Sequence, residues 1–194
     1  MILHLHVSHF SIISQFMIYP FTQSWLPEPE NGFHVGSVEI VRNKGSLRFQ
    51  AELQQPLVST RATAHQQRLW ELGDVVEFFV QKIGDSCYHE YQIAPNGMML
   101  ALHYPDSKSV VSVRNGERRM EEYLSPLPIG NAVLTHSGWS ASLSIPIAGY
   151  KMRLNCGRYD CSMGLPAIIS STSHLTQRDF HRQQDWREIV LVEE

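Results

Sequence analysis

The sequence predicts an all-β protein that folds as a sandwich or a barrel, for three reasons. Apolar and polar residues alternate with a period of two, rather than 3.6, along much of the chain. About ten short segments carry this pattern, and Gly, Pro, Asn and Asp residues separate them, as expected for strands joined by turns. Helical composition is confined to residues 116–124, so one short helix is expected.

The first expected strands lie in the N-terminal quarter of the chain. Residues 2–7 alternate apolar residues with His, which predicts a short strand. Residues 33–40 and 46–53 alternate apolar with small or polar side chains, and Asn43-Lys44-Gly45 lies between them. These two strands are therefore expected to form a hairpin in which Gly45 supplies a positive φ angle.

A central strand is expected over residues 74–82, because this segment is rich in β-branched and aromatic side chains. The turn residues Gly84-Asp85 follow it and lead into an expected strand over residues 87–94. Pro95-Asn96-Gly97 then turns that strand into another, over residues 98–104.

The second half of the chain shows the same alternation. Residues 108–114 form a short alternating run, and residues 139–147 place Trp139 and Leu143 on one side of a strand. Residues 152–159 and 189–192 complete the set of expected strands.

Length and composition fit one globular domain. The chain has 194 residues, of which 43% are hydrophobic and 18% charged, so it can bury a core and is not a disordered tail. Residues 1–32 are expected to form an N-terminal strand and a wrapping arm that contains Pro27 and Pro29, as part of the same domain as the sandwich in residues 33–194. The formal charge of −3 argues against a binder of nucleic acid or of an anionic membrane surface.

The cysteines and the N-terminus exclude some classes of protein. Cys87, Cys156 and Cys161 are odd in number and cannot form a closed disulfide framework. The last two are spaced for one bridge, but reduced, buried thiols are expected. Residues 1–20 lack a basic segment and a cleavage site, and the apolar runs are too short to span a membrane, so a soluble chain is expected and its compartment stays open.

Catalytic motifs are absent from the sequence. It contains no Gly-x-Ser-x-Gly elbow, phosphate-binding loop or His-Glu-x-x-His zinc motif. Asp179 and His181 follow several serines, but a catalytic triad is defined by geometry that spacing alone does not give. Asp74 and Glu77 would serve as a glycosidase pair only if Asp74 precedes its strand, since residues three apart in a strand face opposite sides.

A haem site is an alternative interpretation of the Met and His residues. Met98 or Met99 with His89, His103 or His181 would supply axial ligands. The simpler interpretation is that the two methionines fill opposite faces of a strand. Acidic residues are isolated in the predicted loops, so a dedicated calcium site is not indicated.

Two polar, aromatic-bearing stretches have the composition of a sugar site. Residues 68–77 carry Trp70 and Glu77, and residues 178–186 carry Phe180, His181 and Trp186. Sugars are bound by aromatic rings against their C–H faces and by a few fixed polar groups. The alternative is that Trp70 and Trp186 are aromatic residues at the edge of the core and that Glu77 forms a buried ion pair with Arg158.

The order of the motifs adds a family resemblance. Five motifs occur in a fixed order along the chain. They are Trp-Glu-x-x-Asp-Val-Val-Glu-Phe-Phe (70–79), Tyr-His-Glu-Tyr with Pro-Asn-Gly (88–97), Gly-Trp-x-Ala-x-Leu-x-Ile-Pro (138–146), Leu-Asn-x-x-Arg-Tyr (154–159) and Asp-Phe-His (179–181). This series resembles the family 9 carbohydrate-binding modules and their relatives in the DOMON-like superfamily, from about residue 33 to residue 194. The resemblance implies a two-sheet antiparallel β-sandwich without catalytic activity, whose partner is a mono- or oligosaccharide.

The resemblance also implies which side chains bind the sugar. The implied site residues are Trp70 and Phe180 as stacking rings, with Glu77, Gln92, Asn155, Arg158 and His181 toward the hydroxyls. Arg158 beside Glu77 would keep that carboxyl ionised. Compared with the family pattern, one extra residue separates Trp70 from Asp74, and the second ring is Phe rather than Trp. Some members hold calcium in acidic loops that this sequence lacks, so no cofactor is expected. Family members act outside the cytoplasm, and some relatives bind haem or proteins instead.

Overall fold

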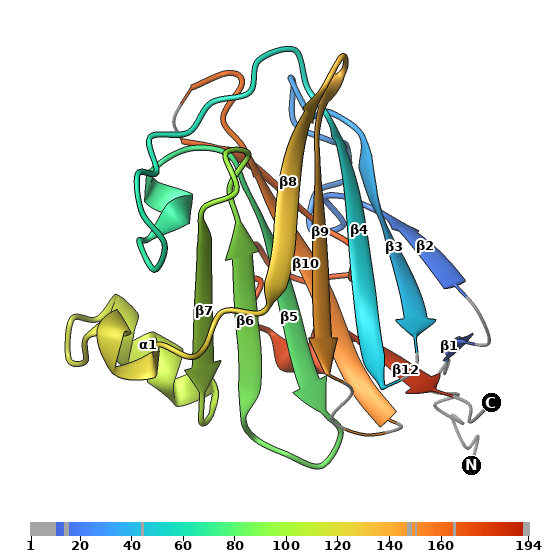
Figure 1. The fold of residues 1–194 in the computed structure, drawn as a ribbon, viewed down its shortest axis with the longest axis vertical. Helices are drawn as coiled ribbons and strands as arrows, with labels where there is room; N and C mark the ends of the chain where they lie inside the picture. The colour runs from blue at the N-terminus through green and yellow to red at the C-terminus, as the bar shows by residue number, and fades with distance from the viewer. Residues whose placement is uncertain are drawn as a thin grey trace.

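Two β-sheets pack face to face in the computed structural model and form a β-sandwich (Figure 1). The structure describes residues 11–13, 16–43, 45–146, 149, 151–164 and 166–191. We call the two layers the large sheet and the small sheet. The expected all-β sandwich is confirmed.

The large sheet has the strand order β1-β12-β10-β5-β6-β7, and β11 also pairs with β10. Its strands are β1 (Ser11–Ile13), β12 (Arg187–Leu191), β10 (Lys151–Asp160), β5 (Val75–Lys82), β6 (Tyr88–Ile93), β7 (Met99–Tyr104) and β11 (Ile168–Ser171). The small sheet has the order β2-β3-β4-β9-β8. Its strands are β2 (Phe16–Pro20), β3 (Gly36–Asn43), β4 (Ser46–Gln54), β9 (Gly138–Pro146) and β8 (Ile129–Thr135). The described strand pairs are antiparallel except β1 with β12, which is parallel.

The core between the sheets follows from the alternation of side chains. In β4 every second residue is buried, from Leu47 to Leu53, while its other residues face outward. The ring of Phe49 on β4 lies 5.4 Å from the ring of Phe78 on β5, centroid to centroid, so the two sheets interlock there. The expected hairpin of residues 33–40 and 46–53 is confirmed as β3 and β4, with Gly45 at a φ of +74°.

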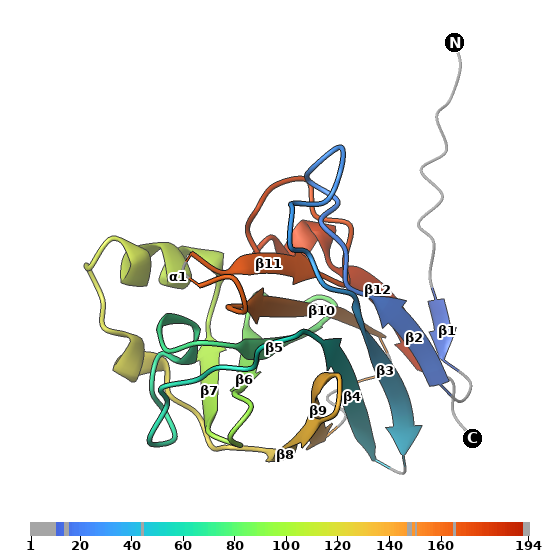
Figure 2. The ribbon, with the colours of Figure 1, turned by 90° about the horizontal axis from the view of Figure 1, so that it is seen from above.

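The large sheet is covered on its outer face as well. Val75, Phe79 and Tyr88 point away from the small sheet and are buried in a second apolar cluster. Helix α1 (Ser107–Arg114) lies beside β7, and α1 and β11 lie on the side of the large sheet opposite β8 and β9 (Figure 2). Because both faces of the large sheet are covered, the sequence of β5 is a nearly continuous run of apolar residues.

Helix α1 replaces the strand that was expected over residues 108–114, so this prediction was wrong. The carboxylate of Asp106 caps the helix by accepting hydrogen bonds from the backbone N–H and the hydroxyl of Ser109, both at 2.9 Å. Val110 and Val113, three residues apart, both pack toward the outer cluster. The helix expected over residues 116–124 is only a 3-10 turn, η2 (Met120–Tyr123).

Four described strands, β1, β2, β8 and β11, were not expected from the sequence. They are short or have exposed apolar residues, such as Ile129 and Leu134 on β8, so their alternation is weak. The strand expected over residues 2–7 lies outside the described residues.

All three cysteines are free thiols. In the described part of the chain, no helix combines the length and apolar character that crossing a membrane requires.

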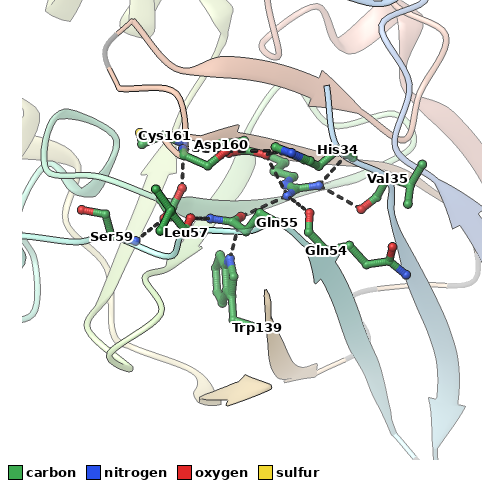
Figure 3. A network of polar contacts seen from close by, with 12 residues as sticks. His34, Val35, Gln54, Gln55, Leu57, Ser59, Trp139, Asp160 and Cys161 are labelled. Atoms are coloured by element: carbon green, nitrogen blue, oxygen red, sulfur yellow. Dashed lines mark hydrogen bonds and ion pairs between the residues drawn. The ribbon is translucent and has the colours of Figure 1, made fainter. Parts of the chain in front are cut away.

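Arg158 on β10 joins the large sheet to the segments before β3 and after β4 of the small sheet. Figure 3 labels the partners His34, Val35, Gln54, Gln55 and Asp160 of Arg158. Its guanidinium donates to the backbone carbonyls of His34, Val35 and Gln54 at 2.8, 3.2 and 2.7 Å, and to Oε1 of Gln55 at 3.0 Å. The carboxylate of Asp160 lies 3.0 Å away and balances its charge.

The polar groups around Arg158 bind one another. Trp139 at the start of β9 donates its indole N–H to the same Gln55 oxygen at 3.2 Å, and His34 contacts Asp160 at 2.8 Å. One residue of β10 therefore holds the segments before β3 and after β4, so the network belongs to the scaffold.

The first prediction concerns this network. Arg158→Met is expected to lower the free energy of unfolding by about 3–5 kcal/mol, because it leaves Asp160 buried without its charge partner. Urea denaturation of the two proteins measures the difference. Arg153→Met on the same strand is the control: Arg153 pairs with Glu188 at 2.7 Å but is partly exposed, and its loss is expected to cost about 1 kcal/mol or less. Equal losses in the two variants would contradict the prediction.

Candidate functional site

A small cavity opens on the outer face of the large sheet, under helix α1. Its volume is about 120 Å³. The 3-10 helix η1 (Leu69–Glu71), strands β5, β6, β7 and β10 of the large sheet, helix α1 and the loop before η3 (Gln183–Asp185) all contribute to it. It is lined by Trp70, Glu77, Glu90, Tyr104, Val110, Val113, Arg114, Tyr159 and His181.

Two carboxylic acids form its polar side. Glu77 on β5 stands opposite Gln92 on β6, and Glu90 lies two residues before Gln92, so all three side chains share the outer face. The amide nitrogen of Gln92 donates to Oε1 of Glu77 at 2.7 Å and to Oε1 of Glu90 at 2.5 Å. One amide thus holds the two acids side by side beneath the cavity.

Burial changes the acidity of this pair. Both side chains are almost fully buried, at 2% and 3% exposure. Burial raises the pKa of Glu90 to about 7, against the opposing effect of the hydrogen bond from Gln92. Burial, and after it the charge of Glu90, raises the pKa of Glu77 well above its ordinary value. The pair therefore holds a proton more readily than exposed glutamates do.

His181 stands next to the acids as a neutral ring. Burial, followed by the positive charge of Arg114, lowers the pKa of His181 to about 3. Its Nδ1 lies 2.8 Å from the Tyr88 hydroxyl, and its Nε2 lies 3.7 Å from Oε2 of Glu90. This second distance is too long for a hydrogen bond. Oε2 of Glu90 is buried and has no hydrogen-bond partner.

An ion pair ties the helix to the loop that carries His181. Arg114, at the last turn of α1, donates to Oδ1 of Asp179 at 2.9 Å. The same oxygen accepts the backbone N–H of His181 at 3.1 Å. The side chain of Arg114 is half exposed, so this pair lies at the rim of the cavity.

A second, shallower cavity adjoins the first. Its volume is about 310 Å³, and Trp70 and Tyr159 line both cavities. Pro166, Ala167, Ile169 and Arg178 complete its lining. Two aromatic side chains, each partly exposed, therefore lie where an acidic recess meets a wider apolar one.

The structure brings together part of the residue set that the sequence indicated. Trp70, Glu77 and His181 line the acidic cavity, and Gln92 binds its two acids from below. Phe180 is only 3% exposed, and its ring packs edge-on against Tyr159 at 5.6 Å. It supports the wall of the site, so the expected open pair of Trp70 and Phe180 rings does not form.

Asn155 and Arg158 lie away from the cavity. Arg158 sits one residue after Gly157, which pairs with Glu77, so its side chain points to the opposite face. The predicted contact between Arg158 and Glu77 is therefore wrong. The side-chain oxygen of Asn155 accepts the Ser171 hydroxyl at 2.7 Å and the Ser173 N–H at 3.2 Å, and so holds the chain after β11.

Besides Val110 and Val113, sequence reasoning missed four polar or aromatic residues that line the cavity. Glu90, Tyr104 and Tyr159 share the outer face of the large sheet with Glu77, and strand alternation would have placed Glu90 with Gln92 once the register was known. Arg114 was hidden by the wrong assignment of residues 108–114 as a strand.

Other features carry less chemistry. A cavity of about 490 Å³ opens beside β8 and β9, but its lining, which includes Tyr91, Leu127 and Ile129, contains no acid or base. Met99 is buried between the sheets and Met98 packs in the outer cluster, so the two haem-ligand candidates face opposite ways. Among the residues that the structure describes, no three His, Cys, Asp or Glu side chains group as a metal site would need.

Comparison with known proteins shows a shared fold. No family model and no curated protein matches the chain. A solved structure from Bacteroides uniformis, described as a "putative carbohydrate-binding protein", has a TM-score of 0.70 and 16% sequence identity, over 91% of this chain and 87% of that chain. At this identity the likeness shows the fold alone. Membership of family 9 or of the DOMON-like superfamily stays a prediction.

The second prediction concerns the packing behind the site. A Cβ atom at Gly157 would lie 2.5 Å from two carbons of the Phe180 ring. Gly157→Ala is therefore expected to lower the free energy of unfolding by about 1–3 kcal/mol, because the ring must shift. Urea denaturation measures this loss. Adding Phe180→Leu makes room for the methyl group, so the double variant is expected to lose less than the sum of the two single losses. Additive losses would show that the ring does not cause the effect.

The third prediction is a dependence of stability on pH. Glu90 has an ordinary pKa of 4.5, raised to about 7 in the folded chain, so the folded chain binds this proton more tightly. Its contribution is present below about pH 4.5 and is lost as pH rises through about 7. Glu90→Gln removes this titration. The stability of wild type relative to the variant is expected to fall by up to about 3 kcal/mol between about pH 4.5 and about pH 8.

Urea denaturation of both proteins across this pH range tests it. His181 acts in the opposite direction, because its lowered pKa makes stability rise with pH between about 3 and its ordinary 6.5. Both proteins contain His181, so subtracting the two curves removes most of this effect. A difference that stays constant with pH would contradict the raised pKa of Glu90.

Proposed function

We propose that the protein is a non-catalytic carbohydrate-binding module of the family 9 type, which binds a sugar on the outer face of the large sheet. The observation that carries the proposal is the position of Trp70. Its ring is half-buried and lines both the acidic cavity and the wider cavity beside it. A sugar ring that stacks on Trp70 places its polar substituents over Glu77 and Glu90.

The polar groups suit the recognition of hydroxyls or other donors. Glu77, Glu90 and His181 are held by packing and hydrogen bonds, so little side-chain entropy is lost when a ligand binds. Buried groups of this kind discriminate strongly, because a ligand without matching donors leaves them unpaired. The Bacteroides uniformis protein of the same fold, with its carbohydrate-binding description, supports the same class of ligand.

The arrangement of the acids supports binding rather than catalysis. Glycosidases place two carboxyl groups on either side of the bond that is cleaved. Here Glu77 and Glu90 project from neighbouring strands into one small recess and accept hydrogen bonds from a single amide nitrogen. A glycosidic bond cannot pass between them without breaking this cluster.

The fourth prediction tests the stacking. Trp70→Ala is expected to weaken sugar binding by about tenfold or more, because it removes the aromatic surface shared by the two cavities. Isothermal titration calorimetry against a panel of mono- and oligosaccharides measures this. Trp25→Ala is the matched control, since Trp25 is also half-buried but does not line either cavity, and it is expected to bind as wild type does.

Two outcomes would count against the proposed function. Wild-type protein that gives no binding heat with any saccharide of the panel would refute sugar binding. Equal weakening in the Trp70 and Trp25 variants would show that loss of folding, and not loss of stacking, causes the effect.

A further inference from the structure

We propose that the acidic cavity binds a protonated amino group, so that the ligands of this protein are amino sugars. The inference rests on the proposed function and names the substrate class of the same site. It is carried by the unpaired carboxylate oxygen in the cavity, by the balance of charge around it and by the size of the two cavities.

The two acids of the cavity lack a compensating cation in the part of the chain that the structure describes. Glu77 and Glu90 are buried side by side, and among the described residues neither has a Lys or Arg side chain within ion-pair distance. The positive charge of Arg114 at the rim is balanced by Asp179. An acid pair without a cation is costly to ionise when buried, and a ligand that brings one positive charge offsets the cost of ionising one of the two acids.

One carboxylate oxygen of the acid pair lacks a hydrogen-bond donor among the described residues. Oε2 of Glu90 is buried and has no hydrogen-bond partner. Glu90 is one of the residues that line the cavity. A hydroxyl offers one proton to such an acceptor, whereas an ammonium group offers three and carries the opposite charge. One ammonium group at this point can therefore serve Glu90 and Glu77 together.

Aromatic walls favour the same ligand. Trp70, Tyr104 and Tyr159 border the acids, and aromatic faces attract a cation that has left water. The acidic cavity, at about 120 Å³, has room for a substituent and a few waters, while the adjoining cavity of about 310 Å³ is the wider of the two. The amino group would enter the first, and the sugar ring would lie against Trp70 and Tyr159 toward the second.

The affinity of the site for an ammonium ligand is expected to depend on pH. The groups that face the two acids are Tyr88 on β6, Tyr104 on β7, Arg114 on α1, Tyr159 on β10 and His181 before η3 (Gln183–Asp185). The tyrosines stay neutral because burial raises the pKa of each, and His181 stays neutral because burial lowers its pKa. The proton that is released when the ligand binds therefore comes from Glu77 or Glu90. An ammonium group needs the carboxylate form, so its binding releases a proton and strengthens from about pH 5.5 to about pH 7.

The fifth prediction is a preference measured by calorimetry with glucosamine, N-acetylglucosamine and glucose. At about pH 7 wild type is expected to bind glucosamine at least about tenfold more tightly than the other two, with proton release seen as a dependence of the heat on the buffer. Glu90→Gln is expected to abolish the preference and the proton release. Glu71→Gln, which removes an exposed acid outside the cavity, is expected to retain both.

A second variant keeps the test valid if Glu90→Gln does not fold. Arg114 is half exposed, and Arg114→Gln removes the positive charge at the rim. It is expected to raise the ratio of glucosamine to glucose affinity, whereas a purely structural role for Arg114 would lower both affinities equally.

The outcomes separate this inference from the proposed function. Equal affinity for glucosamine and glucose, or a preference for N-acetylglucosamine, would overturn the amino-sugar inference and leave sugar binding in place. No binding heat with these three sugars or with the wider saccharide panel would overturn both.

Discussion

Burial of the large sheet on both faces is the constraint on which the rest of this structure depends. The small sheet covers one face, and helix α1 with the segments around β11 covers the other. Polar side chains on the outer face of β5 and β6 are thereby taken out of water. Glu77, Glu90 and Gln92 can only satisfy one another or a ligand there, because bulk water no longer solvates them.

The two faces of the large sheet use their polar residues differently. On the inner face, Arg158 donates to five acceptors, one of them Asp160, and only its Nε lacks a partner, so the group holds the sheets together. On the outer face, the acid pair keeps one buried oxygen without a donor. The difference lies in access, because Glu90 lines a cavity from which a ligand can supply the missing donor, whereas Arg158 lies between the sheets and does not line that cavity.

The walls of the candidate site depend on residues outside its cavity as well as on those that line it. Gly157, opposite Glu77, leaves the space that the Phe180 ring occupies, and that ring supports Tyr159. The ion pair of Arg114 and Asp179 joins α1 to the loop of His181. The shape of the recess is therefore set by packing between elements that are far apart in the sequence.

Local pattern determined the β class, the β3–β4 hairpin and the buried character of β5, because alternation and turn chemistry act over a few residues. Composition also marked Trp70, Glu77 and His181, and the family resemblance added Gln92. Local pattern misjudged residues 108–114, where a cap at Asp106 and the cover of the outer cluster favour a helix over a weak alternation. Only the tertiary structure decided that Arg158 and Glu77 face opposite ways, that Phe180 is buried, and that Glu90 completes the acid pair. Each of these depends on strand register and on which face is covered, which are contacts between distant segments.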